Sequence, residues 1–211
     1  LYLYPEKSAA EKRSSVRNLM LFEPQADYGA RKPNISPELI EQLTRNYKKA
    51  PPPEQIFFYI YAVLYSNTYR TKYAEFLKID FPRIPFTKDY KLFGKMAEYG
   101  KRLVDLHLLK SPELDPPVAK FQCKGDNRVE KLHYDHSQLF INKDQYFEGV
   151  EPKVFEYQIG GYQVCEKWLK DRKDRKLSLD DIKHYCNIVT AIKKTLEIQK
   201  SIDDFYLKIE D

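Results

Sequence analysis

The sequence predicts an α+β fold in which amphipathic helices pack on a small antiparallel β-sheet and a long helix ends the chain. Apolar residues recur at helical spacing through much of residues 36–115 and again in residues 161–211, whereas residues 116–160 alternate in short runs rich in Val, Ile, Tyr and Phe. The 211 residues are enough to bury one core. We therefore expect one domain over residues 1–211, mainly helical over residues 36–115, β-rich over residues 116–160 and helical over residues 161–211.

The first 35 residues mix short apolar runs, such as "LYLYP" and "NLMLF", with charged and turn-forming residues. This mixture is typical of strands and loops rather than of a helix. Because the opening run resembles a strand entered midway, we expect residues 1–35 to be a truncated strand and loop layer.

The first helix is predicted after Ser36, in "SPELIEQLTRNYKK". Ser36 is a good N-cap, Pro37 suits the first turn, and acids early with bases late complement the helix dipole. The prolines of residues 51–53 separate this helix from a second one. The second helix carries an apolar stripe at helical spacing: Ile56, Phe57, Ile60, Val63 and Leu64. The run "TYRTKYAEFLK" predicts a further short helix.

Two prolines in "IDFPRIPFTKDY" exclude a continuing helix, so this stretch predicts an extended path to a new helix N-terminus at Thr87. Residues 88–110 then repeat apolar positions along one face: Leu92, Met96, Leu103 and Leu106. We expect one long amphipathic helix there, ending before Pro112.

Four strand-like runs follow in residues 116–160: "VAKFQCKG", "NRVEKLHYD", "QLFINKDQYF" and "KVFEYQI". They are rich in β-branched and aromatic residues, which favour strands. The turn-rich stretches "GDN", "DHS" and "EGVEP" divide them. This pattern predicts antiparallel strands joined by tight turns.

A glycine pair, Gly160 and Gly161, ends the fourth run and suits a strand-to-helix turn with positive φ. The spacing of these glycines matches neither the dinucleotide-binding pattern nor the P-loop. Such a turn would free the helix N-terminal amides of Tyr162, Gln163 and Val164, either as an ordinary turn or as a contact for a phosphate oxygen. We expect the turn to aim a basic helix, over residues 167–176, away from the sheet.

The last helix is predicted from the stretch "LSLDDIKHYCNIVTAIKKTLEIQKSIDDFYLKI". Its first apolar positions lie three and four residues apart: Ile182, Tyr185, Val189, Ile192 and Leu196. The later apolar positions shift around the helix: Ile198, Ile202, Phe205 and Ile209. We therefore expect this helix to bend or to change its packing partner past Leu196.

The composition limits the function classes without choosing one. The formal net charge of +5 permits binding to a polyanion but does not require it. Three widely spaced cysteines, Cys123, Cys165 and Cys186, show no pairing pattern, so reduced thiols of a cytoplasmic protein are expected. No apolar run approaches the roughly 20 residues of a membrane span, and no signal segment opens the chain.

Catalytic and metal-binding patterns are weak in this sequence. A nuclease trio can be drawn from Asp144, Glu151 and Lys153. Pro152 argues against it, because proline is rare in a central strand. The possible zinc ligands match no standard spacing: Cys123, His133, His136 and Cys165 or Cys186. Hydrogen-bonded structural histidines are the better interpretation. No nucleophile motif is present. We therefore expect neither a catalytic residue nor a metal site.

A basic run follows the glycine pair. Its six bases stand among three acids: Lys167, Lys170, Arg172, Lys173, Arg175 and Lys176. Such a run is either a solvated helix face or a nucleic-acid contact. Trp168 lies at helical spacing from Val164 and Cys165, so we expect it in the core rather than in a platform for stacking.

The chain carries, in this order, the strings "YIYAVLYSNTYRTKYAEFLKIDFPRIPF" (59–86), "LVDLHLL" (103–109), "QYFEGV" (145–150) and "YQIGGYQVCEKWLKDRKDRKLS" (157–178). Together they resemble the C-terminal specificity domain of type ISP restriction-modification enzymes, over most of the chain from about Arg31 onward. The first string also has the general shape of other DNA target-recognition domains.

This resemblance implies a sequence-specific DNA recognition module that is not itself an enzyme. It would be part of a bacterial-type defence enzyme whose single polypeptide also holds a nuclease, an ATP-driven translocase and an adenine methyltransferase. The implied partners are double-stranded DNA and the adjacent methyltransferase domain. S-adenosylmethionine, ATP and Mg²⁺ would belong to the other domains, and no cofactor to this one. The alternative is a helical interaction module that docks on a methyltransferase without reading sequence.

The same resemblance divides the candidate DNA contacts into two groups. Contacts to phosphates would set register and salt dependence, with Gly161 assisting through the amides that follow it: Lys167, Lys170, Arg172 and Lys173. Base edges would be read from the hairpin region: Lys124, Asn127, Arg128, Lys131, His133 and Tyr134. Three further bases stay open between DNA contact and surface ion pairing: Arg70, Lys72 and Arg83.

Overall fold

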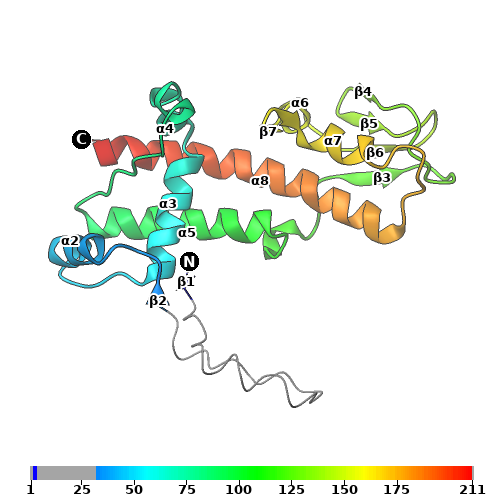
Figure 1. The fold of residues 1–211 in the computed structure, drawn as a ribbon. Coiled ribbons are helices and arrows are strands. Elements are labelled where there is room, and N and C mark those ends of the chain that lie inside the picture. The colour runs from blue at the N-terminus through cyan, green and yellow to red at the C-terminus, as the bar shows by residue number, and fades with distance from the viewer. Residues whose placement is uncertain (1, 4–31, 211) are drawn as a thin grey trace, which may run out of the picture.

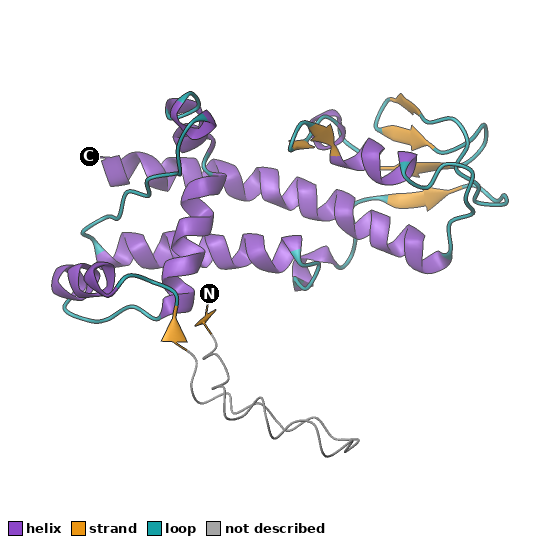
Figure 2. Ribbon diagram, in the orientation of Figure 1, coloured by secondary structure: helices purple, strands orange, loops and turns teal. Residues whose placement is uncertain are grey.

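The computed structural model describes residues 2–3 and 32–210, and Figure 1 shows an α+β fold built around two long helices. α5 (Tyr90–His107) and α8 (Leu179–Glu210) pack side by side, and α3 (Pro53–Tyr65) crosses them. A small sheet lies at the N-terminal end of α8 (Figure 2). The described residues also form α2 (Pro37–Tyr47), α4 (Asn67–Lys72), α6 (Pro152–Phe155), α7 (Val164–Lys170), η2 (Phe76–Lys78) and η3 (Pro112–Leu114). The predicted fold class is confirmed.

Side chains next to the helices fix where the helices begin. Ser36 caps α2 with its hydroxyl oxygen, as the sequence predicts. The helix expected from Thr87 begins instead at Tyr90, because the carboxylate of Asp89 accepts the amide of Lys91 at 2.8 Å and caps α5. Thr87 is buried before this start. The run expected to form one further short helix is divided between α4 and η2.

The helical part has its own buried cluster. It is built mainly from α3, α5 and the C-terminal half of α8, with Ile56, Tyr59, Val63, Met96, Leu103, Leu106, Ile198, Ile202 and Tyr206 among its members. Two fully buried tyrosines in it also hold the extended path after η2. Tyr59 donates its hydroxyl to the carbonyl oxygen of Pro85 at 2.7 Å, and Tyr69 donates to that of Arg83 at 3.0 Å. The tyrosines therefore fill the core and fix this segment together.

The β-rich part forms a four-stranded antiparallel sheet in the order β3-β6-β5-β4. Its strands are β3 (Lys120–Gln122), β4 (His133–Asp135), β5 (Gln138–Phe140) and β6 (Tyr146–Glu148). One row of side chains in register belongs to a second buried cluster: Phe121, Phe147, Leu139 and Tyr134. The N-terminal half of α8 covers this face, with the rings of Phe147 and Tyr185 4.3 Å apart.

The run "KVFEYQI" is not the fourth strand that the sequence predicts. Pro152 starts α6 there, because its fixed φ suits the first turn of a helix. The chain then forms a hairpin of β7 (Gln158–Ile159) and β8 (Tyr162–Gln163). Gly160 and Gly161 have φ of 58° and 83°, the signs that a two-residue hairpin turn requires. The glycine pair therefore joins two strands, and not a strand to a helix.

The final helix changes its packing partner along its length. Tyr185 and Val189 in its first half belong to the cluster under the sheet. Ile198 and Ile202 in its second half belong to the helical cluster. This confirms the change of partner predicted from the shift in the apolar stripe near Leu196, and α8 becomes the common support of both parts (Figure 1).

Little of the N-terminal layer can be compared with its prediction. β1 (Tyr2–Leu3) pairs antiparallel with β2 (Lys32–Pro33). The rest of the strand and loop layer expected over residues 1–35 lies largely outside the described residues. Among the helices of residues 2–3 and 32–210, none is long and apolar enough to cross a membrane.

Candidate nucleic-acid interface

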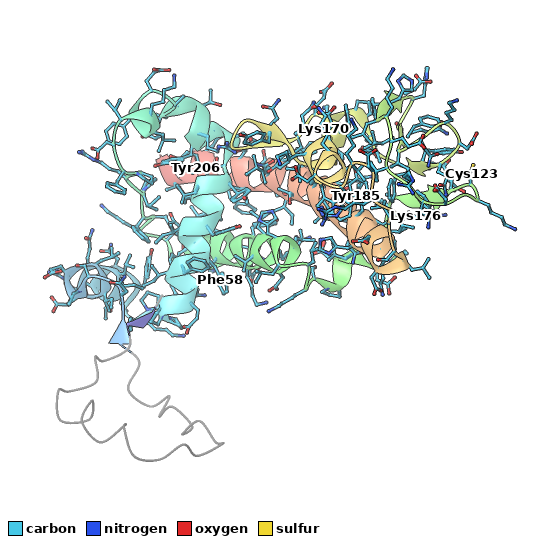
Figure 3. The ribbon with its side chains drawn as sticks, turned by 45° about the vertical axis from the view of Figure 1, so that its right-hand side comes forward. Phe58, Cys123, Lys170, Lys176, Tyr185 and Tyr206 are labelled. Atoms are coloured by element: carbon cyan, nitrogen blue, oxygen red, sulfur yellow. The ribbon has the colours of Figure 1, made fainter. Side chains whose placement is uncertain are left out.

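Two loops that carry predicted DNA contacts lie against each other at the sheet end of the molecule. Main-chain hydrogen bonds join residues 123–131 to residues 171–177, and we call this pair of loops the basic junction. The amide of Val129 donates to the carbonyl oxygen of Arg175 at 2.9 Å, and the amide of Leu177 donates to that of Asn127 at 2.9 Å. Figure 3 shows Cys123 and Lys176 at this end. Residues predicted separately for bases and for phosphates are thus brought together.

This pairing also corrects the length of the basic helix. α7 ends at Lys170 and does not continue to residue 176 as predicted. Asp174 has a φ of 64°, which turns the chain out of the helix, and its amide donates to the carbonyl oxygen of Val129 at 2.7 Å. An isolated β-bridge pairs Arg128 with Lys176. The last bases of the run therefore lie on a bridged loop and not on a helix face.

Two of the six base-reading candidates have their polar atoms engaged within the fold. Asn127 donates its side-chain amide to the carbonyl oxygen of Leu177 at 3.4 Å and accepts the side-chain amide of Gln145 at 2.8 Å. Tyr134 donates its hydroxyl to the carbonyl oxygen of Val150 at 2.9 Å and stacks on Phe155. Burial raises the pKa of Tyr134. Both side chains hold the sheet and its loops in place.

Arg128 is partly engaged. Its guanidinium donates to the carbonyl oxygen of Asp174 at 2.9 Å, and its Nε lies 3.5 Å from a carboxylate oxygen of Asp126. The same carboxylate lies 3.5 Å from Nζ of Lys176. A hydrogen bond from the main-chain amide of Arg128 lowers the pKa of Asp126, and the nearby ammonium group of Lys176 lowers it further. Asp126 thus holds two basic side chains of the basic junction, Arg128 and Lys176, near each other.

The other three base-reading candidates are exposed. Lys124, Lys131 and His133 point away from the buried cluster under the sheet. Among the described residues, neither Lys124 nor Lys131 forms an ion pair. His133 lies on the face of the sheet opposite the core, with its ring 6.0 Å from that of Phe140. These three side chains are therefore accessible to solvent at the sheet end.

The four predicted phosphate contacts differ in how tightly the fold holds them. Lys167 pairs with Asp171 at 2.5 Å and Lys170 pairs with Glu166 at 2.8 Å, both at the surface. Exposed ion pairs of this kind are weak, so a phosphate can compete with them. Lys173 is exposed and has no ion pair with any described residue.

Arg172 is the phosphate candidate that the fold holds most firmly. Its guanidinium stacks 3.5 Å from the centre of the Trp168 ring and donates to the Trp168 carbonyl oxygen at 3.0 Å. Its Nε lies 4.0 Å from a carboxylate oxygen of Asp181 on α8. Trp168 packs at the edge of the second buried cluster, as predicted for a core residue. Arg172 therefore ties the basic junction to α7 and α8.

The expectation of three unpaired amides after Gly161 is wrong. The amide of Val164 donates to the carbonyl oxygen of Tyr157 at 3.1 Å, and Tyr162 and Gln163 form β8. α7 has seven residues, with Gln163 as its N-cap. Gly161 itself lies at the tip of the hairpin, with open space around it. A contact of Gly161 with a phosphate stays a prediction, without a helix N-terminus behind it.

The outer face of the sheet carries a row that the sequence analysis missed. In register across four strands lie Gln122, Tyr146, Phe140 and His133. The rings of Phe140 and Tyr146 are 4.9 Å apart. The alternation of buried and outward positions in β5 and β6 is the signal that could have found this row. His133 is the only member that was predicted as a contact.

The weak metal-binding and catalytic patterns of the sequence gain no support from the geometry. The described residues contain no group of three or more His, Cys, Asp and Glu side chains that could hold a metal ion. Glu151 pairs with Lys193 at 2.6 Å, and Lys153 lies on α6. Cys165 is buried, which raises the pKa of its thiol to about 12. Neither the nuclease trio nor the zinc set is assembled among these residues.

The chain matches a family of known proteins over nearly its whole length. The family model described as the Type ISP C-terminal specificity domain matches residues 1–201. No curated protein matches the chain.

Three solved structures share the fold. A nuclease-deletion mutant of the Type ISP restriction-modification enzyme LlaGI in complex with a DNA substrate mimic is 22% identical with a TM-score of 0.57, covering 72% of this chain and 14% of that one. The ATP-dependent Type ISP restriction-modification enzyme LlaBIII bound to DNA is 19% identical with a TM-score of 0.62, covering 82% and 12%. A DrdV–DNA complex is 23% identical with a TM-score of 0.65, covering 80% and 20%. The chain therefore spans a fifth or less of these proteins.

Proposed function

The chain belongs to the family of Type ISP C-terminal specificity domains, and on this premise we propose that it binds double-stranded DNA and reads the target sequence for a restriction-modification enzyme. The match of the family model to residues 1–201 is the observation that carries the proposal. The similar structures of LlaGI, LlaBIII and DrdV are all complexes with DNA or a DNA mimic, which supports it. The chain itself carries no catalytic step in this proposal.

We assign the basic junction, together with the neighbouring α7 and β4, to DNA. Lys167 and Lys170 contact phosphates, because they are exposed and only weakly paired. Lys173 does the same, because it is exposed and has no ion pair with any described residue. Lys124 and Lys131 reach base edges, since an ammonium group donates hydrogen bonds to guanine acceptors in the major groove. His133 extends this contact surface along the outer face of the sheet.

The rest of the proposal concerns the enzyme around this chain. We infer a methyltransferase domain next to it in the same polypeptide, which uses S-adenosylmethionine to modify an adenine at the recognised site. ATP and Mg²⁺ serve cleavage in other domains. We place the enzyme in the cytoplasm, where bacterial DNA lies. The competing function, a module that docks on the methyltransferase without reading sequence, predicts no DNA binding by this chain.

The salt dependence of DNA binding tests the assignment of the phosphate contacts. The measurement is fluorescence anisotropy of a labelled random-sequence duplex at several salt concentrations. The logarithm of the association constant is expected to fall linearly with the logarithm of the salt concentration. Replacing Lys167, Lys170 and Lys173 with Ala is expected to reduce the magnitude of this slope by about 2 to 3. The matched control replaces Lys91, Lys95 and Lys101 on α5 with Ala, which removes the same charge from a surface that includes comparable ion pairs.

Two results would contradict this assignment. If both triple variants reduce the slope equally, the effect is one of net charge and these three lysines are not the phosphate contacts. If the unsubstituted chain shows no salt-dependent binding, the module that docks on a methyltransferase is the better account.

A further inference from the structure

A short loop after η2 exposes two large apolar side chains to solvent. Phe81 is 88% exposed and Ile79 is 84% exposed, more than any other large hydrophobic residue among the described ones. We call residues 79–83 the apolar loop. The two residues lie two positions apart, and contiguous exposed apolar surface often marks a binding site. The loop lies far from the basic junction, near α4 at the other end of α8 (Figure 1).

The apolar loop is held in shape by the fold. Tyr69 donates its buried hydroxyl to the carbonyl oxygen of Arg83 at 3.0 Å, where the loop ends. The amides of Ile79 and Asp80 both donate to the carbonyl oxygen of Phe76 at 3.1 Å, where it begins. The amide of Phe81 donates to the carboxylate of Asp80 at 2.7 Å. A tip ordered in this way loses little conformational entropy on binding.

The segment that carries this apolar tip is basic. Residues 67–83 contain four bases, Arg70, Lys72, Lys78 and Arg83, against two acids, Glu75 and Asp80. Lys78 pairs with Glu75 at 2.6 Å, and Arg83 lies 3.8 Å from Asp80. Arg70 is exposed and forms no ion pair with any described residue. An apolar tip within a segment of excess positive charge is complementary to a polyanion with an apolar interior.

α8 connects the short helix before this tip, α4, to the basic junction. Asp203 of α8 holds the start of α4, accepting the amide of Thr68 at 3.0 Å and the hydroxyl of Ser66 at 2.7 Å. Asp181 of α8 lies 4.0 Å from Nε of Arg172 in the basic junction. A rise of 1.5 Å per residue places these two aspartates about 33 Å apart along the axis of α8. At 3.6 residues per turn, their directions around the helix differ by about 40°, so both lie on the same face. Figure 1 shows α4 and α7 on the same side of α8.

The spacing of these two anchoring aspartates is close to one turn of B-form DNA, about 34 Å along its axis. We propose that the apolar loop is a wedge that inserts Phe81 between base pairs of bound duplex DNA, about one turn from the basic junction. Arg70 and Arg83 contact the phosphates beside the inserted ring. Apolar side chains that enter a base step unstack it and bend the duplex, which lets more protein surface reach the DNA. The proposal rests on the DNA-binding function proposed above and adds a second contact to it.

Two variants of Phe81 test the wedge by different readouts. The Phe81→Ala variant is expected to bind a labelled 24-base-pair random-sequence duplex about tenfold more weakly, because stacking on a base is lost. Leu207→Ala, which also truncates an exposed apolar side chain near the C-terminal end of α8, is expected to leave the affinity unchanged. Because Phe81 and Leu207 are exposed, both variants are expected to keep the thermal stability of the parent chain.

The Phe81→Trp variant reports stacking directly. The natural sequence has one tryptophan, so the emission of the parent chain can be subtracted. Saturating duplex is expected to quench the added emission, as stacking on bases does. Duplex binding with unchanged emission, or equal losses of affinity in Phe81→Ala and Leu207→Ala, would overturn the wedge and leave DNA binding intact. Absence of any duplex binding by the parent chain would overturn the proposed function as well.

Discussion

Replacing Gly100 with alanine is expected to destabilise the protein by about 3 kcal/mol. Gly100 lies in α5 where α3 crosses it, and a Cβ there would meet the carbonyl oxygen of Phe58 at 1.8 Å and its carbonyl carbon at 2.6 Å. These are main-chain atoms of a packed helix, so no side-chain rotation relieves the clash. The gain in helix propensity from Gly to Ala is only about 1 kcal/mol and does not offset it.

Gly94 supplies the matched control, because it lies in the same helix and a Cβ there would meet nothing within 4 Å. Gly94→Ala is expected to stabilise the protein by up to about 1 kcal/mol. Urea denaturation of both variants measures the difference. Equal stabilities for the two variants would show that α3 and α5 do not approach each other as closely as the structure has them.

Replacing Gln145 with alanine is expected to cost about 3 kcal/mol and to loosen the basic junction. Gln145 is 1% exposed, and its side chain accepts the amide of Asn127 at 2.9 Å and donates to the Asn127 side-chain oxygen at 2.8 Å. It also donates to the carbonyl oxygen of Cys123 at 3.3 Å. Alanine would leave several partners unsatisfied and a cavity among them, which is why the expected cost exceeds that of one hydrogen bond.

Gln122→Ala is the control for this variant, because Gln122 lies on the same sheet but bonds only to the exposed carboxylate of Glu148 among the described residues. Its expected cost is below about 1 kcal/mol. Hydrogen exchange provides a second readout, in which residues 123–128 are expected to lose protection in Gln145→Ala and keep it in Gln122→Ala. Unchanged protection in both variants would mean that Gln145 does not hold the loop.

Local sequence predicts the helical part of the fold well because the determinants are themselves local. Ser36 caps its helix as expected, and the shift in the apolar stripe of the last helix marks where α8 passes from one cluster to the other. The helix start predicted at Thr87 is wrong because Thr87 and Asp89 can both cap a helix, and their spacing alone does not show which one does. Asp89 prevails because its carboxylate reaches the amide of Lys91.

The β-rich part is predicted less well because its partners are distant in sequence. The apolar residues of "KVFEYQI" are typical of a strand. One turn of α6 also buries apolar side chains in the second cluster, so the same residues fit a helix. The turn that follows α7 depends on a residue distant in sequence, because the carbonyl oxygen of Val129 accepts the amide of Asp174. No pattern within residues 167–176 contains that information.

The candidate interface shows the same limit. Residue type alone cannot separate Asn127 and Tyr134, whose polar atoms are bound inside the fold, from Lys124 and Lys131, which are exposed. The glycine pair is likewise a turn with positive φ, as predicted, but it serves a hairpin. Which residues contact DNA stays a prediction that the binding variants decide.

Selection of bound duplexes from a randomised pool tests the central claim, that this chain reads a DNA sequence, most directly. After several rounds at fixed salt, the recovered duplexes are expected to share one base pattern. The chain is expected to bind a duplex with that pattern about a thousandfold more tightly than a shuffled one, the lower end of the range for specific recognition. Recovered duplexes that remain random, or equal affinities for the selected and shuffled duplexes, would contradict the account.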